Sequence, residues 1–347
     1  MTSPIRKAME KLPRTDTAAY FLAVAHAPMV VATDTPESRF LAVEDGDATK
    51  AATRLAAYWR SRREIFRDRA LLPMEQTGRG TLDSKEIDMW KTAVLVNAPK
   101  DASGRSVLVF DVSRLKPSHS YPSFDDVRLR LGFYVFSLAA ENPLAQSVGV
   151  VAICLVTKAP RLSVHRKLMK LIKESLPIRS IEFHAVILPS RGTLGRFTQT
   201  ILDFYQLALE PLTRIASIHR GETDDDVLEE LERSGFRRSG LPEWVGGTWS
   251  ENDFHSGRER RLDLERQRYL SDAERATMRR EADALRARKK RERTRVETGL
   301  LQHQVSALKA ENEALRTEGQ RLELLVNYAT TMLFSSGYGH ASTDDFR

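Results

Sequence analysis

The placement of proline is the sequence feature that most constrains how this chain folds. All 14 prolines lie at or before Pro242, and none follows in the rest of the 347-residue chain. Proline interrupts helices because it lacks an amide N–H and clashes with the preceding turn. The last third of the chain is therefore free to form one long helix, whereas the first two-thirds must turn often. We place the boundary between the two regions near residue 250.

A long helix with a repeating apolar seam is predicted after residue 270. Ser271-Asp272-Ala273-Glu274 has the spacing of a capping box, and no proline prevents the helix from continuing to about Tyr328. Leucine recurs every seven residues along this helix, which is the pattern of a two-stranded coiled coil. A polar Asn in such a seam favours a parallel pair in one register. We therefore predict a homodimer or heterodimer through Leu301, Val305, Leu308, Asn312, Leu315 and Leu322.

The positive charge of the chain is concentrated just before this seam. Residues 258–295 contain 15 Arg or Lys and 8 Asp or Glu, an excess of seven that equals the net charge of +7 for the whole chain. A near-neutral body with one basic segment suggests contact with a polyanion, although a merely solvated face is the alternative. The residues expected to make this contact are Arg286, Arg288, Lys289, Lys290, Arg291, Arg293 and Arg295.

The basic segment followed by the leucine seam resembles the basic leucine zipper family of transcription factors. The arginine of that family's basic region falls on Arg291, while Asp283 stands where the family has its base-reading asparagine. The resemblance implies binding to duplex DNA, with two basic helices entering the major groove. The alternative partner for the same charges is an acidic membrane surface, with the coiled coil serving only to dimerise.

An α/β layer is predicted for the first two-thirds of the chain. Short apolar or β-branched runs occur at residues 93–96, 107–110, 148–156, 181–188 and 216–218, and helical patterns separate several of them. Residues 148–156 are almost continuously apolar, as expected of a strand buried on both faces of a partly parallel sheet. Residues 48–66 carry one apolar stripe at helical spacing and predict a helix.

Three stretches in order resemble the CRAL-TRIO lipid-transfer family. The most specific is Leu241-Pro242-Glu243-Trp244-Val245-Gly246-Gly247, after residues 40–66 and the run 176–209. The resemblance implies an α/β fold with a mixed or parallel sheet, an N-terminal helical region and a pocket for one lipid or other small hydrophobic ligand. A helix over residues 194–209 takes the place of the family's gate helix, although its apolar face would also suit simple core packing. The lipid-pocket residues implied are Leu194, Phe197, Ile201, Phe204 and Tyr205.

Basic groups near the end of the predicted domain are candidates for contact with a ligand head group. Arg214 lies nearest to the family's lysine after the gate helix, and His219 and Arg220 close a short strand beside a glycine. A surface loop without a ligand is the alternative for His219 and Arg220. His184 lies inside a predicted strand and is interpreted as a hydrogen-bonded core histidine.

No catalytic or metal-binding arrangement is found in the sequence. The single cysteine, Cys154, excludes an internal disulfide and a cysteine cluster for zinc, and we find no nucleophile, base and electrophile that belong together. No cofactor is expected apart from a bound lipid. The chain lacks a secretory signal and any run of 18 apolar residues, so a nuclear or cytoplasmic location is expected.

The predicted organisation has six parts. They are an N-terminal extension over residues 1–35, a helical region over 36–75, a lipid-binding domain over 76–249, a charged linker or fraying helix over 250–270, the basic region and zipper over 271–329, and a tail over 330–347. Two functional hypotheses follow. The first is a non-enzymatic transcription regulator that senses a hydrophobic ligand and binds DNA. The alternative is a lipid-binding or lipid-transfer protein whose coiled coil only dimerises.

Overall fold

The structure of the protein is a computed structural model that describes residues 3–115, 124–156, 162–191, 214–268 and 272–336. Two units separate along the chain, residues 1–269 and residues 270–347, so the boundary lies about twenty residues beyond the one predicted. Among the described helices, none is both long enough and apolar enough to cross a membrane.

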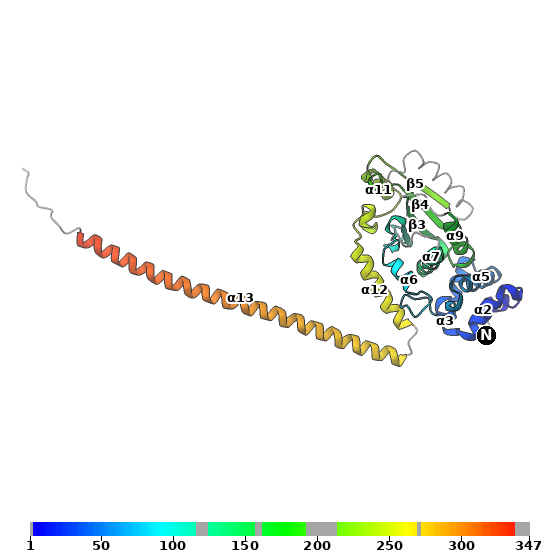
Figure 1. The fold of residues 1–347 in the computed structure, drawn as a ribbon, viewed down its shortest axis with the longest axis horizontal. Coiled ribbons are helices and arrows are strands. Elements are labelled where there is room, and N and C mark those ends of the chain that lie inside the picture. Colours follow the sequence, from blue (N-terminus) through cyan, green and yellow to red (C-terminus); the bar gives the residue numbers. More distant parts are fainter. Residues whose placement is uncertain (1–2, 116–123, 157–161, 192–213, 269–271, 337–347) are drawn as a thin grey trace, which may run out of the picture. The chain divides into compact units, whose positions relative to one another are not determined.

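A five-stranded mixed sheet forms the centre of the first unit (Figure 1). Its strands are β1 Leu95–Ala98, β2 Val107–Asp111, β3 Val150–Leu155, β4 Ile181–Val186 and β5 Arg214–His219. They lie side by side in sequence order, with β1 antiparallel to β2 and the other neighbours parallel. Each strand overlaps one of the five apolar runs, which confirms the predicted α/β class.

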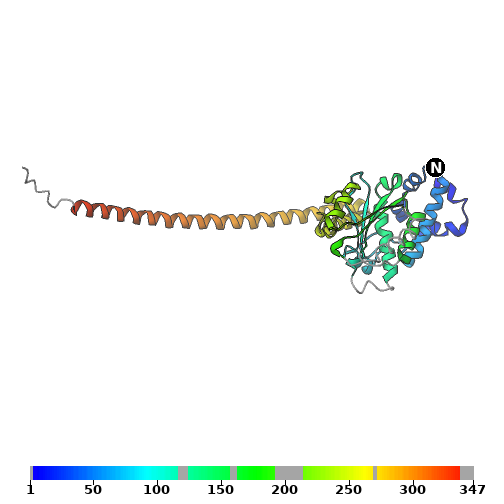
Figure 2. The ribbon, with the colours of Figure 1, turned by 90° about the horizontal axis from the view of Figure 1, so that it is seen from above.

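Helices cover both faces of the sheet (Figures 1 and 2). On one face Phe136 of helix α7 lies 5.9 Å from Phe110 of β2, measured between ring centroids. On the other face Phe236 lies edge-on against His184 of β4 at 4.8 Å. All six residues of β3 are buried, which explains the continuous apolar run that predicted this strand. The helices of the sheet region are α6 Ser84–Trp90, α7 Asp125–Ala139, α8 Leu144–Ser147, α9 Leu162–Ser175 and α11 Asp224–Arg233.

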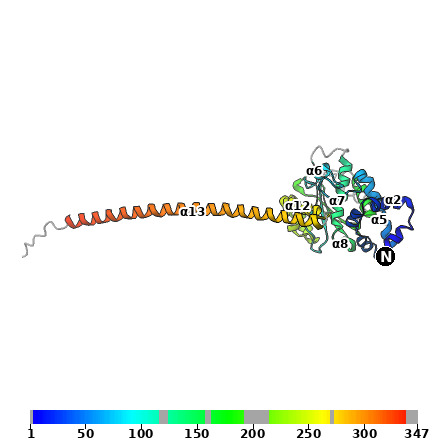
Figure 3. The same cartoon turned by 90° about the horizontal axis from the view of Figure 1, so that it is seen from below.

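The N-terminal residues fold into helices that pack on the predicted helix over residues 48–66 (Figure 3). These helices are α1 Pro4–Met9, α2 Arg14–His26, α3 Pro28–Asp34 and α4 Glu37–Val43, and the helix on which they pack is α5 Ala48–Phe66. Ile5 and Met9 are fully buried, so residues 1–35 are part of the folded unit instead of an extension from it. The boundaries of α5 match the prediction, and the Asp47 side chain caps its first turn by accepting from the amides of Thr49 and Lys50.

A buried ion pair lies at the centre of this helical region. Arg62 of α5 is fully buried and donates to Asp34 at 2.7 Å, to the Tyr58 hydroxyl at 3.1 Å and to the carbonyl of Leu72 at 2.5 Å. The guanidinium also lies over the Trp59 ring at 4.7 Å. These contacts compensate for the desolvation of the charge, so the arginine ties α3, α5 and the following loop together.

The Leu-Pro-Glu-Trp-Val-Gly-Gly motif forms a closed turn. The amide of Trp249 donates to the carbonyl of Leu241, and the amide of Gly247 donates to the carbonyl of Pro242, both at 3.0 Å. A Cβ atom at position 247 would lie 1.9 Å from the Leu241 oxygen, so only glycine fits there. The described short 3-10 segments of this unit are η1 Arg67–Arg69, η2 Val112–Arg114, η5 Pro189–Arg191, η7 Arg238–Gly240 and η8 Glu243–Val245.

The charged segment predicted as a linker or fraying helix over residues 250–270 is the ordered helix α12, Glu251–Arg268. Ser250 and Asp253 exchange hydrogen bonds and cap its first turn. Phe254 is 4% exposed and packs 6.1 Å from Trp90, so the helix begins against the core. Apolar periodicity did not reveal this docking because Phe254 is one of only two buried residues of the helix, and the other is a glutamate.

That glutamate, Glu265, fixes the second half of α12 to the unit. Its side chain is fully buried and accepts from the Tyr134 hydroxyl at 2.6 Å, from the amide of Gln76 at 2.9 Å and from Arg261 Nε at 2.9 Å. A buried carboxylate is tolerated when several donors replace its hydration. Polar contacts therefore hold α12 where the sequence suggested a solvated segment.

The described part of the second unit is the helix α13, Asp272–Ser336. It runs eight residues beyond the predicted end at Tyr328, since neither proline nor glycine interrupts residues 320–336. The predicted start agrees to within one residue, but Ser271 of the capping box lies outside the described residues. Side chains of this helix are described for residues 287–332.

Candidate functional site

The predicted gate lies between the fourth and fifth strands. β4 ends at Val186 and β5 begins at Arg214, and residues 192–213 of the connection lie outside the described residues. The five predicted pocket residues are among them, so their role stays a prediction; they are Leu194, Phe197, Ile201, Phe204 and Tyr205. The described structure nevertheless places both ends of this connection on neighbouring parallel strands.

The predicted head-group residues occupy three different environments on and after β5. Arg214 begins the strand opposite Glu182, and its side chain lies outside the described set. Arg220 is exposed immediately after the strand. His219 ends the strand and is fully buried, so the alternative of an exposed loop is wrong for this residue.

His219 pairs with the second buried histidine. His219 Nε2 lies 2.9 Å from His184 Nδ1, and the two rings stack with an angle of 17° between their planes. His184 is 2% exposed, and its Nε2 lies 3.1 Å from the carboxylate of Glu182. The interpretation of His184 as a hydrogen-bonded core histidine agrees with this geometry. The alternation Glu182-x-His184 places both side chains on one face of β4.

Glu182 is held by an arginine from the segment before β2. Arg105 donates to Glu182 at 2.6 Å and to Asp101 at 2.6 Å. Burial raises the pKa of Glu182, but the hydrogen bond and charge of Arg105 outweigh that effect and leave the pKa below its ordinary value. Glu182 is therefore ionised at neutral pH and accepts a hydrogen bond from the Nε2–H group of His184.

These contacts determine which nitrogen of each histidine carries the proton. Because Glu182 accepts from His184 Nε2, a neutral His184 must accept at Nδ1, and His219 Nε2 must donate to it. His219 Nδ1 is then an acceptor that lies 3.7 Å from the Glu230 carboxylate, and it has no hydrogen-bond partner in the described part of the chain. Two acceptors face each other there, which accounts for the missing hydrogen bond.

Both imidazoles are uncharged at neutral pH. Burial lowers the pKa of His184, and burial together with repulsion from a protonated His184 lowers the pKa of His219 to about 4. The arrangement joins the segment before β2, strands β4 and β5 and helix α11. Within the described residues, no group of three or more His, Cys, Asp or Glu side chains is arranged to hold a metal ion.

The sequence indicated His184 and His219 but gave little sign of the groups that surround them. Arg105, Glu182 and Glu230 come from three separate segments, and only Glu182 carried a signal, since a charged residue two positions before a histidine in an apolar strand shares its face. The pairing of β4 with β5 brings the two histidines together, and that pairing depends on the crossover connection between the strands.

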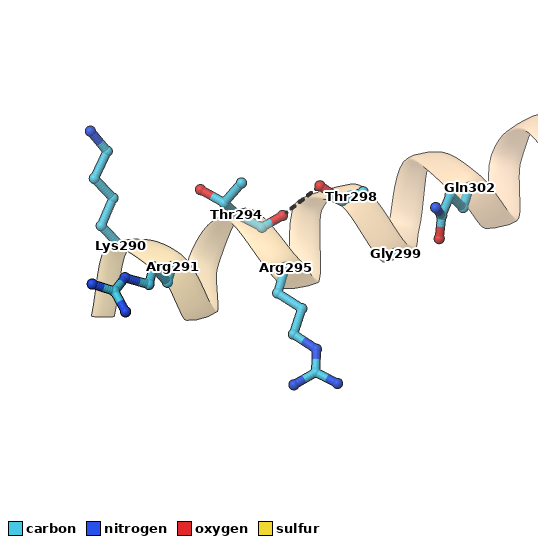
Figure 4. A pocket seen from close by; sticks show the side chains of 7 residues that line it. All are labelled: Lys290, Arg291, Thr294, Arg295, Thr298, Gly299 and Gln302. Atoms are coloured by element: carbon cyan, nitrogen blue, oxygen red, sulfur yellow. Dashed lines mark hydrogen bonds between the residues drawn. The ribbon is translucent and has the colours of Figure 1, made fainter. Parts of the chain in front are cut away.

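The basic segment of α13 is exposed on all sides of the helix. Arg288, Lys289, Lys290, Arg291, Arg293 and Arg295 are all exposed, and Arg286 lies on the helix with its side chain outside the described set. Figure 4 shows Lys290 and Arg295 projecting in different directions around a shallow surface that reaches Gly299 and Gln302. The hydroxyl of Thr298 donates to the carbonyl of Thr294 at 2.8 Å along this surface. Such a divergent set of cations suits an extended anionic surface better than a small anion.

The leucine seam of α13 is uncovered. Its apolar side chains are 51% to 65% exposed, and Asn312 between them is exposed as well. They are Leu301, Val305, Leu308, Leu315 and Leu322. A row of half-exposed apolar residues with a seven-residue repeat is typical of a helix that pairs with another helix. Asp283 lies within α13, and its side chain is outside the described set.

Residues 104–254 match the model of the divergent CRAL/TRIO domain. The matched region runs from just before β2 to the start of α12, and it contains both histidines and the closed turn at Gly247. It does not include residues 36–75, so the assignment of that region to the same family stays a prediction, and it does not reach α13. The chain matches no curated protein.

Proposed function

We propose that this chain, whose residues 104–254 form a divergent CRAL/TRIO domain, is a non-catalytic protein that binds a small hydrophobic ligand, with a lipid as the ligand class. The family match carries the proposal. Two further observations support it: the parallel strands β4 and β5 are joined by a long crossover, and the sequence of that crossover has a broad apolar face at the place of the family's gate helix.

Lipid retention by the purified chain tests this proposal. Native mass spectrometry of protein purified from a lipid-rich extract should show one lipid per chain. Phe197→Asp places a charge on the apolar face of the crossover and should reduce the retained lipid at least about tenfold, since burying a carboxylate costs several kcal/mol. Phe21→Asp, at a partly exposed phenylalanine of α2, is the matched control. Equal loading of both variants, or no retained lipid in the parent protein, contradicts the proposal.

We further propose that α13 pairs with a second copy and presents its basic segment to an acidic membrane surface. The uncovered leucine seam and the exposed cations support these two parts. Each Lys or Arg near an anionic bilayer contributes about 1 kcal/mol, so doubling the segment in a dimer raises the affinity steeply. A ligand-binding domain joined to such a helix would deliver or collect its lipid at a membrane.

Duplex DNA is the second candidate partner, because the basic segment and the leucine seam lie on one uninterrupted helix. That is the arrangement by which two paired helices diverge into the major groove. Asp283, at the position of the family's base-reading asparagine, disfavours sequence-specific contact because a carboxylate repels phosphate and lacks the amide's donor. The membrane surface is therefore the partner that we favour.

One pair of titrations with the full chain separates the two partners. Binding is measured to phosphatidylcholine vesicles with and without phosphatidylserine, and to duplex DNA across a salt series. We expect binding to the anionic vesicles alone, weakened by Lys290→Ala and Arg291→Ala and unchanged by Arg233→Ala on α11. Tight, salt-dependent DNA binding without vesicle binding would reverse the choice. Binding to neither partner would contradict both.

A further inference from the structure

A cavity of about 480 Å³ lies at the β1 edge of the sheet, within the first unit. Its walls come from α6, β1, the end of α7, the Trp249 loop and α12. The crossover that carries the predicted gate joins β4 to β5, and β1 and β5 are the two opposite edges of the sheet. The cavity is therefore separate from the lipid site proposed above, and its volume lies within the range of sites for small molecules.

The cavity has an aromatic wall. Trp90 and Trp249 both pack edge-on against Phe254, with ring centroids 6.1 Å and 6.2 Å apart. Trp90 also packs edge-on against Tyr134 at 5.1 Å, which fixes its ring from the core side. Rigid aromatic rings offer apolar contact at low cost in conformational entropy. Trp90 and Phe254 are 3% and 4% exposed, so the half-buried Trp249 supplies most of the aromatic surface on which another ring can pack.

The charged residues of the lining carry a net positive charge. Glu141 is the single acidic residue among them, and Arg261 donates to it through both terminal nitrogens at 2.5 Å and 2.7 Å. Arg268 adds a third hydrogen bond at 2.9 Å. Burial raises the pKa of Glu141, but these arginines outweigh burial and lower it to about 2. Arg261 thus neutralises Glu141, which leaves the charges of Lys100 and Arg258 for a ligand.

Two buried donors of the lining lack an acceptor. In the described part of the chain, neither Arg258 Nε nor Trp90 Nε1 has a hydrogen-bond partner, although Arg258 donates elsewhere to the Gln76 side chain at 3.3 Å. A buried donor without an acceptor is unfavourable. Both atoms are shielded from solvent, so the groups that the cavity presents to a ligand are the charges of Lys100 and Arg258 and not these two donors.

We propose that this cavity binds a small organic anion built from an aromatic ring and a carboxylate. The ring packs on Trp90, Trp249 and Phe254, and the carboxylate lies toward Lys100 and Arg258. Helix α12 contributes Phe254 and Arg258, so the complete site exists only while α12 is docked. The ligand therefore stabilises the docked state of α12 by mass action.

Gly257 of α12 provides a way to close the cavity without disturbing the fold. It lines the cavity, and a Cβ atom built there would approach no other atom closer than 3.9 Å. A leucine at this position fits the helix and has a higher helix propensity than glycine. Its side chain extends into the space that the ligand would occupy. Gly299→Leu on α13, where a Cβ atom would meet nothing within 4 Å, is the matched control.

The test is isothermal titration calorimetry of the full chain with naphthalene-2-carboxylate, compared with the neutral 2-naphthylmethanol. We expect a dissociation constant on the order of 0.1 to 1 mM for the carboxylate, as for ligands of this size. The alcohol should bind at least about tenfold more weakly, and Lys100→Met should weaken the carboxylate about fivefold. Gly257→Leu should abolish binding, whereas Gly299→Leu should leave it unchanged.

Three results would overturn the proposal: no saturable binding of the carboxylate, equal binding of the alcohol, or unchanged binding to Gly257→Leu. Hydrogen exchange gives an independent measurement, because the carboxylate should slow exchange of the α12 amides in the parent protein and not in Gly257→Leu. Phe197→Asp separates this site from the lipid site, since that variant should lose lipid and keep naphthalene-2-carboxylate binding.

Discussion

The two units of this protein differ in what they leave without a partner. Among the described residues of the first unit, charged side chains such as Arg62 and Glu265 are buried, and Asp34 compensates the first while Tyr134 and Gln76 compensate the second. In α13 the reverse holds, because leucines at seven-residue spacing are more than half exposed. The first unit thus pairs its buried charges with groups of its own, whereas the helix exposes a row of apolar side chains that suits a partner.

Arg62→Met should produce the largest loss of stability, and it should do so in the first unit only. It leaves Asp34 buried without its cation, which costs about 3 to 5 kcal/mol in the free energy of unfolding. Urea denaturation monitored by tryptophan fluorescence measures the effect. Arg60→Met breaks the exposed pair with Asp16 and should cost less than about 1 kcal/mol. Equal losses for the two variants would show that burial does not set the value of these pairs.

Leu308→Asp combined with Leu315→Asp should act on the second unit only. Each leucine buried in a pair of helices contributes about 1.5 to 3 kcal/mol, so the double variant should weaken dimerisation more than about 100-fold. Sedimentation equilibrium measures the change. Leu324→Asp lies outside the seam at a side chain that is 71% exposed, and it should leave the dimer intact. A parent chain that stays monomeric at high concentration would contradict the pairing.

Glu265→Gln tests whether polar contacts dock α12. The amide keeps the size of the side chain, but its NH₂ group replaces an oxygen that accepted hydrogen bonds and now faces the same donors. The free energy of unfolding should therefore fall by about 2 kcal/mol. Faster hydrogen exchange in α12 would report it. Glu259→Gln, at an exposed position of the same helix, should leave exchange unchanged. If both variants behave like the parent protein, the contacts of Phe254 and the ion pairs of Arg261 and Arg268 with Glu141 hold the helix without Glu265.

The buried histidines predict a small dependence of stability on pH in the first unit. Because the pKa of folded His219 is about 4, the unfolded chain binds more protons below its unfolded pKa of about 6.5. The free energy of unfolding should therefore fall as the pH drops, and His219 should account for about 1.4 kcal/mol of that loss by a pH of about 5.5. His219→Gln should reduce the change of the urea midpoint between pH values of about 7.5 and 5.5. His26→Gln, at an exposed position, should leave that change as it is in the parent protein. A slope that survives His219→Gln would assign it to other groups.

The sequence predicted features that depend on local patterns. All five strands, helix α5 and the long helix α13 followed from apolar periodicity, the capping box and the distribution of proline. Docking of α12 did not follow, because a glutamate and a single phenylalanine fix it and neither makes an apolar stripe. Of the groups around the histidines only Glu182 carried a signal, because Arg105 and Glu230 come near them only after the strands pair.

The closed turn at Gly247 limits how far this sequence can drift. A substitution there puts a carbon atom 1.9 Å from a backbone oxygen, and backbone, unlike the tip of a side chain, has no room to move aside. Gly235 differs, because its φ of +93° is unfavourable for other residues but a Cβ atom there would meet nothing within 4 Å. Selection from a randomised library should therefore return glycine alone at 247, while asparagine persists at 235. Descendants of this domain can lose Gly235 and still fold, but they cannot lose Gly247.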